Sequence, residues 1–156
     1  MQCSGCVPDQ GIINLRPPDL AQLQTLLCAN HLPAEDCTEQ ASIFCGIFEA
    51  QELIAAGGLE AAGECALLRS IVVRADRRGK GLAQALTEHL LQRAETEGRA
   101  AVYLLTETAS DYFTRLGFST VERADVPLAI TRTRQFSSLC PDSADCLCLP
   151  LPRGSG

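Results

Sequence analysis

The spacing of apolar residues changes along the chain and predicts an alternation of strands and helices. Short runs rich in Ile, Val, Leu and Phe are typical of strands, whereas apolar residues three or four positions apart are typical of one helix face. These patterns predict strands over residues 11–16, three runs between 41 and 73, 100–107, 118–123 and 145–151. They predict helices over residues 17–31, 82–97, 109–116 and 126–136.

The middle of the chain indicates how the sheet is connected. The runs between residues 41 and 73 are interrupted at 49–51 and at 62–63, so we expect two consecutive antiparallel hairpins. The strand that ends at Val73 is followed by a helix and then by the buried-strand run at 100–107. We expect these two strands to be parallel and joined by a right-handed crossover. The fold class is therefore α/β.

Length and composition bound the class of protein. A chain of 156 residues, 46% of them apolar, is the size of one domain, so we expect a single domain over residues 1–151 and a flexible tail over 152–156. The net charge of −6 argues against general nucleic-acid binding, which requires a basic surface. No apolar run approaches a membrane span, and the first residues do not resemble a signal peptide. We therefore expect a cytoplasmic protein with neither a membrane nor a nucleic-acid partner.

A basic, glycine-containing turn stands out against this acidic background. Residues 74–83, RADRRGKGLA, place four cations and two glycines between a strand and a helix. A P-loop would need a glycine at Arg74, and a dinucleotide fingerprint would need one at Gln84, so neither motif is present. Two interpretations remain. The free amides and dipole of the helix N-terminus can bind a phosphate group, or the turn is an exposed basic loop that needs glycine only for its dihedral angles.

Four segments follow one another along the chain: the strand LLRSIVV, the turn RRGKGLA, the strand VYLLT and the segment YFTRLGF. Their arrangement resembles the GCN5-related N-acetyltransferase (GNAT) superfamily, over roughly residues 11–123. The resemblance implies the acyl-CoA N-acyltransferase fold, a mixed and mostly antiparallel sheet that splays between its fourth and fifth strands, with flanking helices. It implies acetyl-CoA as co-substrate, with the pantetheine arm along Ile71, Val72 and Val73. The pyrophosphate would then lie against Arg77, Arg78, Gly79, Lys80, Gly81, Leu82 and Ala83.

Three positions depart from the superfamily pattern. Asp76 stands where Gln or Arg is usual, and its carboxylate should weaken pyrophosphate binding unless it points away or pairs with an arginine. Thr106 replaces a common Asn, and Phe113 replaces a tyrosine that often protonates the leaving thiolate. The resemblance implies that both positions contact the cofactor. Tyr112, the neighbour of Phe113, is then the candidate catalytic tyrosine.

Acyl transfer to an amine also needs a base or a water molecule that removes a proton. Glu64, at the start of the strand that precedes the glycine turn, is our first candidate, because several members of the superfamily carry a glutamate near that point. Glu60, Glu107 and Asp111 are alternatives. Each of these carboxylates can equally be an exposed residue of a turn.

Nine cysteines are a high and odd count. Cys146 and Cys148 should share one strand face, close to Cys140, but the spacings fit no zinc pattern, so we predict no metal site. The C-terminal part resembles a narrower group, the arsenic-resistance N-acetyltransferase-like proteins, and soft trivalent arsenic prefers thiolates. Alternatively, the thiols pack as small apolar groups. The residues that carry the match are Phe136, Leu139, Cys140, Pro141, Ser143, Ala144 and Cys146.

These features together lead to a functional hypothesis. We expect an acetyl-CoA-dependent N-acetyltransferase that acts on the amino group of a small molecule, in arsenic or toxin resistance, since acetylation removes the charge of the amine. Two alternatives stay open: an acyl-CoA-binding sensor without turnover, and a thiol-based metalloid binder. Homodimers are common in the superfamily, so a homodimer is a further possibility.

Overall fold

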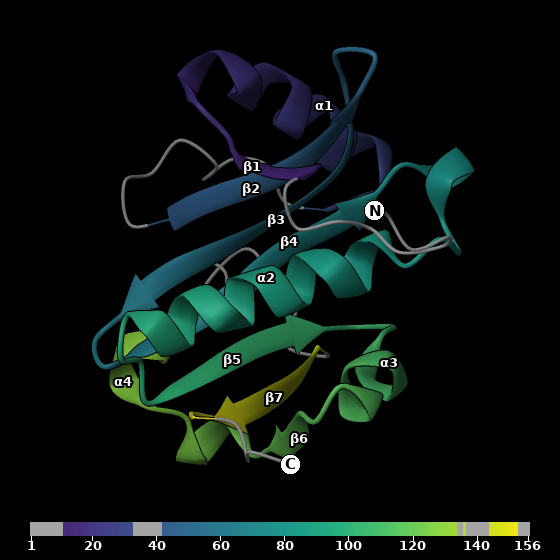
Figure 1. Cartoon of the computed structure of the whole chain (residues 1–156). Coiled ribbons are helices and arrows are strands. Elements are labelled where there is room, and N and C mark those ends of the chain that lie inside the picture. Colours follow the sequence, from purple (N-terminus) through teal and green to yellow (C-terminus); the bar gives the residue numbers. More distant parts are fainter. Residues whose placement is uncertain (1–10, 33–41, 134–135, 137–143, 153–156) are drawn as a thin grey trace.

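The computed structural model describes residues 11–32, 42–133, 136 and 144–152, and its elements follow the predicted order (Figure 1). The strands are β1 (Ile12–Asn14), β2 (Ser42–Glu49), β3 (Glu52–Ala62), β4 (Cys65–Val73), β5 (Ala101–Thr106), β6 (Ser119–Val121) and β7 (Asp145–Pro150). The α-helices are α1 (Leu20–Ala29), α2 (Leu82–Thr96), α3 (Ser110–Arg115) and α4 (Leu128–Thr131).

The seven strands form one mixed sheet in the order β1-β2-β3-β4-β5-β7-β6. Every neighbouring pair is antiparallel except β4 and β5, which are parallel and connected through α2. Both predicted hairpins and the predicted parallel pairing of β4 with β5 through a helix are therefore confirmed. The arrangement is the mixed, mostly antiparallel sheet of the acyl-CoA N-acyltransferase fold.

β4 and β5 stay together over only part of their length. Their ladder consists of Ala66 opposite Val102 and Leu67 opposite Tyr103, although β4 continues to Val73. Beyond Leu67 the two strands separate, and in Figure 1 the sheet is divided between them, with α2 lying along the front. The splay implied by the superfamily resemblance is thus present.

Helices cover both faces of the sheet because successive strand residues point to opposite sides. Cys45 and Leu68 belong to a buried cluster with the apolar face of α2, and Phe44 and Val72 belong to another with α1. A third cluster joins α4 to Leu67, on the face opposite to Leu68. The core therefore has one layer on each face of the sheet. The gap between β4 and β5 lies in the sheet itself, between these two layers.

The first predicted helix is shorter than expected. The segment that contains Pro17 is a 3-10 turn, and α1 begins only at Leu20. Within its described residues, the predicted helix over 126–136 contains α4, which ends at Thr131. The hydroxyl of Thr133 donates to the carbonyl oxygen of Ile130 at 2.7 Å, and such side-chain bonds compete with helix continuation.

Candidate active site

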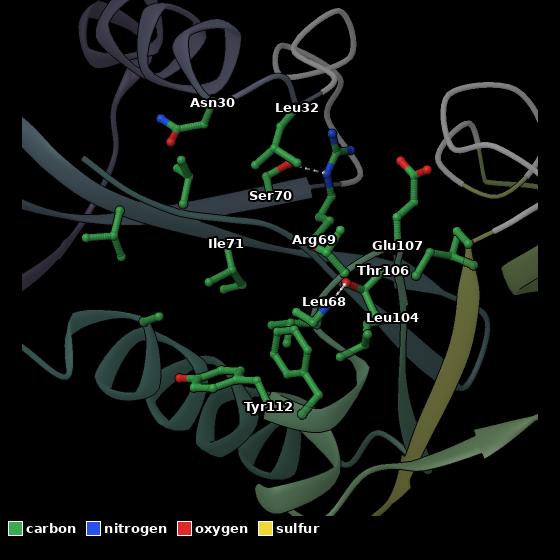
Figure 2. Close-up of a pocket in the computed structure, with 18 of the residues that line it drawn as sticks. Asn30, Leu32, Leu68, Arg69, Ser70, Ile71, Leu104, Thr106, Glu107 and Tyr112 are labelled. Atoms are coloured by element: carbon green, nitrogen blue, oxygen red, sulfur yellow. Dashed lines mark hydrogen bonds between the residues drawn. The ribbon is translucent and has the colours of Figure 1, made fainter. Parts of the chain in front are cut away.

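A cavity of about 900 Å³ opens where β4 and β5 separate (Figure 2). The end of α1, the second half of β4, the start of α2, the end of β5 and α3 all contribute to its wall. Its volume is typical of cavities that bind cofactors and small molecules. The predicted site residues that line it are Ile71, Val72, Val73, Arg78, Ala83, Thr106, Tyr112 and Phe113.

β4 is irregular beside this cavity. The register with β3 shifts between Ala56 and Gly58, so that Gly57 faces two residues of β4, Ser70 and Ile71. The shift is a β-bulge, which leaves one residue outside the ladder, and Ser70 takes up a left-handed φ of +58°. Since β5 has already diverged, the bulge presents main-chain groups of β4 to the cavity. Such groups can bind an extended ligand or stabilise an oxyanion.

The glycine turn borders the same cavity. Gly79 and Gly81 have φ angles of +79° and +80°, which favour glycine. A Cβ atom built on either glycine would meet no atom within 4 Å, so the space above the turn is open. Gly81 is also the N-cap of α2, whose first amides have no partner within the helix. Amides, helix dipole and free volume together fit the pyrophosphate of acetyl-CoA.

Two of the four cations of the turn are neutralised by carboxylates. Arg74 donates to Asp76 at 2.7 Å and to Glu52 at 2.8 Å, and Arg77 donates to Glu49 and Asp76. The hydrogen bond from Arg74 lowers the pKa of Asp76, and the bond from Arg77 lowers that of Glu49. The arginine pairing that the sequence required of Asp76 is therefore present, whereas Arg77 is engaged with β2 rather than directed at the cavity.

Arg78, Lys80 and Leu82 differ in whether their side chains could contact a ligand in the cavity. Arg78 donates to the carbonyl oxygen of Val73 at 3.3 Å and to the side chain of Asn30, so it closes the cavity against α1. Lys80 is exposed, and the described part of the chain offers it no ion pair or hydrogen bond. The side chain of Leu82 is buried in the core. A ligand could therefore meet Leu82 only through its main chain.

Two aromatic rings form the wall at α3. The rings of Tyr112 and Phe113 are 5.1 Å apart in an edge-to-face contact, and Phe113 makes a similar contact with Phe118. Burial raises the pKa of Tyr112, so its hydroxyl is protonated and able to donate at neutral pH. The hydroxyl of Thr106 accepts a hydrogen bond from the amide of Ala109 at 3.0 Å. Thr106 thus fixes the start of α3 through its oxygen, and its hydroxyl can still donate a hydrogen bond.

The candidate bases do not share one location. Glu64 is exposed in the turn before β4 and does not line the cavity, and its carbonyl oxygen accepts from the amide of Ala100 at 2.8 Å. This is the end where β4 and β5 are still paired, so the position of Glu64 does not support its predicted role. Glu107, at the end of β5, does line the cavity. Asp111 is exposed on α3 and lies outside the lining.

The structure also adds residues that the sequence interpretation did not assign. Asn30, His31, Arg69 and Ser70 line the cavity. Figure 2 shows Arg69 and Glu107 pointing to the side where Leu32 lies, with Tyr112 on the opposite side. The sequence did contain an indication of Arg69 and Ser70, because they interrupt an otherwise apolar strand. Burial of polar side chains costs free energy unless they are hydrogen-bonded.

Comparison with known proteins gives the family. A family model described as the acetyltransferase (GNAT) family matches residues 14–118, more than half of the chain. The chain belongs to the GNAT family. No curated protein matches this GNAT chain significantly.

Solved structures show the same fold at low sequence identity. N-acetylglutamate synthase from Neisseria gonorrhoeae, complexed with coenzyme A and N-acetyl-glutamate, is 16% identical with a TM-score of 0.76 over 91% of this chain. Rv2747 from Mycobacterium tuberculosis, in complex with CoA and NLQ, is 19% identical with a TM-score of 0.74, and 90% of this chain and 98% of Rv2747 are covered. The ribosomal-protein-S18-alanine N-acetyltransferase from Escherichia coli is 20% identical with a TM-score of 0.69, and 93% of this chain and 95% of that chain are covered.

The first of these proteins is much longer, because this chain spans only 35% of the Neisseria synthase. One of these proteins is complexed with an acetylated amino acid, and another is named for a ribosomal protein. At these sequence identities the comparison shows the shared GNAT fold.

The described cysteines of this GNAT chain differ in exposure: Cys45 and Cys146 are buried, whereas Cys28 is exposed. Cys146 is 2% exposed, and burial raises its pKa to about 11. Burial likewise raises the pKa of Cys148, which forms a hydrogen bond with the side chain of Tyr103. Cys140 lies outside the described residues. Within the described part of the chain, no three His, Cys, Asp or Glu side chains are grouped as a metal site would require.

Among the described residues, none of the helices has both the length and the apolar character needed to cross a bilayer.

Proposed function

We propose that this GNAT chain transfers an acetyl group from acetyl-CoA to the amino group of a small molecule. The observation that carries the proposal is the cavity at the splay, which combines the open glycine turn, the unpaired main chain of β4 and the polar groups at the ends of β5 and α3. A multiply charged, elongated co-substrate needs these features along one path.

Binding would use main-chain groups more than side chains. The amides at Gly79 to Ala83 would hold the pyrophosphate, with Arg78 and Lys80 as the nearby cations. The pantetheine arm would pair with the main chain of Ile71, Val72 and Val73, on the side that β5 has left unpaired. Arg77 would contribute indirectly, because its bond to Glu49 fixes the turn against β2.

For the transfer itself, the amine nitrogen attacks the thioester carbonyl carbon, and the carbon–sulfur bond then breaks. We propose Glu107 as the group that accepts the proton from the amine, directly or through water, since it is the carboxylate of the four candidates that both lines the cavity and lies at its rim. Main-chain amides of the β4 bulge would stabilise the carbonyl oxygen. Tyr112 would return a proton to the CoA sulfur, since its raised pKa keeps the hydroxyl protonated.

We further propose that the acceptor is a toxic amino compound, for example one that contains arsenic. The support is the resemblance of the C-terminal segment to the arsenic-resistance group, and Ala144 of that segment lines the cavity. A thiol-based role for Cys146 has less support, because a buried thiol with a raised pKa is a poor metalloid ligand. The cytoplasmic location, the single domain over residues 1–151 and the homodimer stay predictions.

The test is calorimetric titration of acetyl-CoA into the reduced protein, followed by a free-thiol assay across amines, amino acids and arsenic-containing amino acids paired with their carbon analogues. Binding with turnover of an amine supports the enzyme, and a preference for the arsenic-containing member of a pair supports the narrower acceptor. Binding without turnover for any acceptor would instead favour the acyl-CoA sensor. Absence of binding would overturn the proposed function.

A further inference from the structure

The β4 bulge contains a strained residue at the point nearest to the proposed chemistry. Ser70 is the non-glycine residue of β4 with a positive φ, at +58°, and L-residues with a side chain disfavour this conformation. Such strain persists only when the surroundings hold it in place. The contacts of Ser70 therefore identify what maintains the bulge.

The neighbouring residue, Arg69, is bonded to Ser70 through its side chain. Its Nε donates to the Ser70 hydroxyl at 3.3 Å, and its Nη1 donates to the hydroxyl of Ser42 and to the carboxylate of Glu60, each at 3.3 Å. The guanidinium thus connects three strands, since Ser42 belongs to β2, Glu60 to β3 and Ser70 to β4.

This connection is sealed from solvent. The side chain of Arg69 is 1% exposed and that of Glu60 is 12% exposed. The guanidinium also lies over the ring of Phe44, 5.4 Å from its centre. A Cβ atom on Gly58 would lie 2.5 Å from that ring and 3.3 Å from Arg69 Cγ, so a glycine is needed for this packing. A buried charge held by so many groups is a rigid element.

We propose that Arg69, anchored by Glu60, is a positioning residue that holds Ser70 in its left-handed conformation and thereby directs the bulge amides at the thioester carbonyl. The inference rests on the proposed function, because it assigns the source of the geometry that acetyl transfer would use. Arg69 touches neither acetyl-CoA nor the acceptor in this role. It acts through Ser70, and the effect appears in the polarisation of the carbonyl group.

The experiment measures the infrared band of the acetyl carbonyl in bound, ¹³C-labelled acetyl-CoA, together with its Kd by calorimetry. The wild-type protein should shift the band to lower frequency, and Arg69→Met should lose most of that shift, with Kd changed by less than about threefold. Its kcat should fall about 100-fold, the size expected for misplaced catalytic groups. Adding Ser70→Gly to Arg69→Met should restore most of the shift, because glycine adopts this φ without support.

A matched control is Arg93→Met, which removes another ion-paired arginine, bonded to Glu97 at 2.9 Å on the surface of α2, and should leave band and rate unchanged. If Arg69→Met does not fold, Ser70→Ala removes the hydroxyl alone and should weaken the shift. An unchanged band in these variants, or no recovery with Ser70→Gly, overturns the inference. Failure of the wild-type protein to bind acetyl-CoA overturns the proposed function instead, so the two failures are distinguishable.

Discussion

The two ends of β4 show how one strand can be core at one end and line a candidate active site at the other. At the first end, Ala66 and Leu67 pair with β5 and are almost fully buried. At the second end, Ile71 to Val73 are equally apolar, yet β5 has separated and a cavity lies beside them. The difference lies in the neighbouring strand. Whether an apolar strand becomes core or binding surface depends on whether its edge stays paired.

The largest effect is expected at the glycine turn of the open end. Gly81→Glu should raise the Kd for acetyl-CoA by about 100-fold or more, because a carboxylate and its bulk would occupy the open space that we propose for the pyrophosphate. Calorimetry gives the Kd. Gly98→Glu is the control, since Gly98 also has a positive φ and open surroundings but lies beyond the other end of α2. Equal affinity in both variants would remove the turn from the site.

The two ends of β4 can be compared directly through one carboxylate near each, Glu107 and Glu64. Glu107→Gln should lower kcat by about 100-fold, since it removes the proposed base. Glu64→Gln, at the paired end, should leave kcat within about twofold. The free-thiol assay at saturating acetyl-CoA measures both. A loss with Glu64→Gln alone would return the base to the position first favoured by the sequence.

The pH dependence tests Tyr112. Burial raises the pKa of its hydroxyl above the ordinary value for tyrosine, so the protonated, donating form is lost at higher pH than in an exposed tyrosine. The wild-type rate should therefore decline only in the strongly alkaline range. Tyr112→Phe should lower kcat by roughly tenfold and remove this alkaline decline, because a CoA thiolate can leave without strong acid help. An identical pH profile in both proteins would contradict the role.

The smallest effect is expected from Asp76, whose charge is already neutralised. Asp76→Asn would release Arg74 and Arg77 from one partner each and should tighten acetyl-CoA binding by less than about fivefold, since exposed ion pairs contribute little. Titrations at low and high salt should show the gain only at low salt. A large gain would mean that Asp76 points into the site.

Much of the fold and part of the site could be predicted from the sequence. Apolar periodicity depends on near neighbours, so it located the strands, the hairpins and the crossover, and glycine requirements located the turn at Gly79 and Gly81. The GNAT resemblance then identified Ile71 to Val73 and Arg78, which do line the cavity. The C-terminal cysteine match at Cys140 lies outside the described residues.

The tertiary structure alone decided which polar groups meet. Arg77 is bonded to Glu49, 28 residues away, and Arg74 to Glu52, 22 residues away, and no local pattern reveals such pairs. The same holds for the separation of β4 from β5, which excludes Glu64 from the cavity and includes Glu107. Ser70 is left-handed at a bulge opposite Gly57, although a residue with a side chain disfavours this conformation. The sequence by itself determined the elements and the position of the glycine turn, since these depend on short-range sterics and spacing. The chemistry of the site depends on contacts between distant segments, and only folding brings those together.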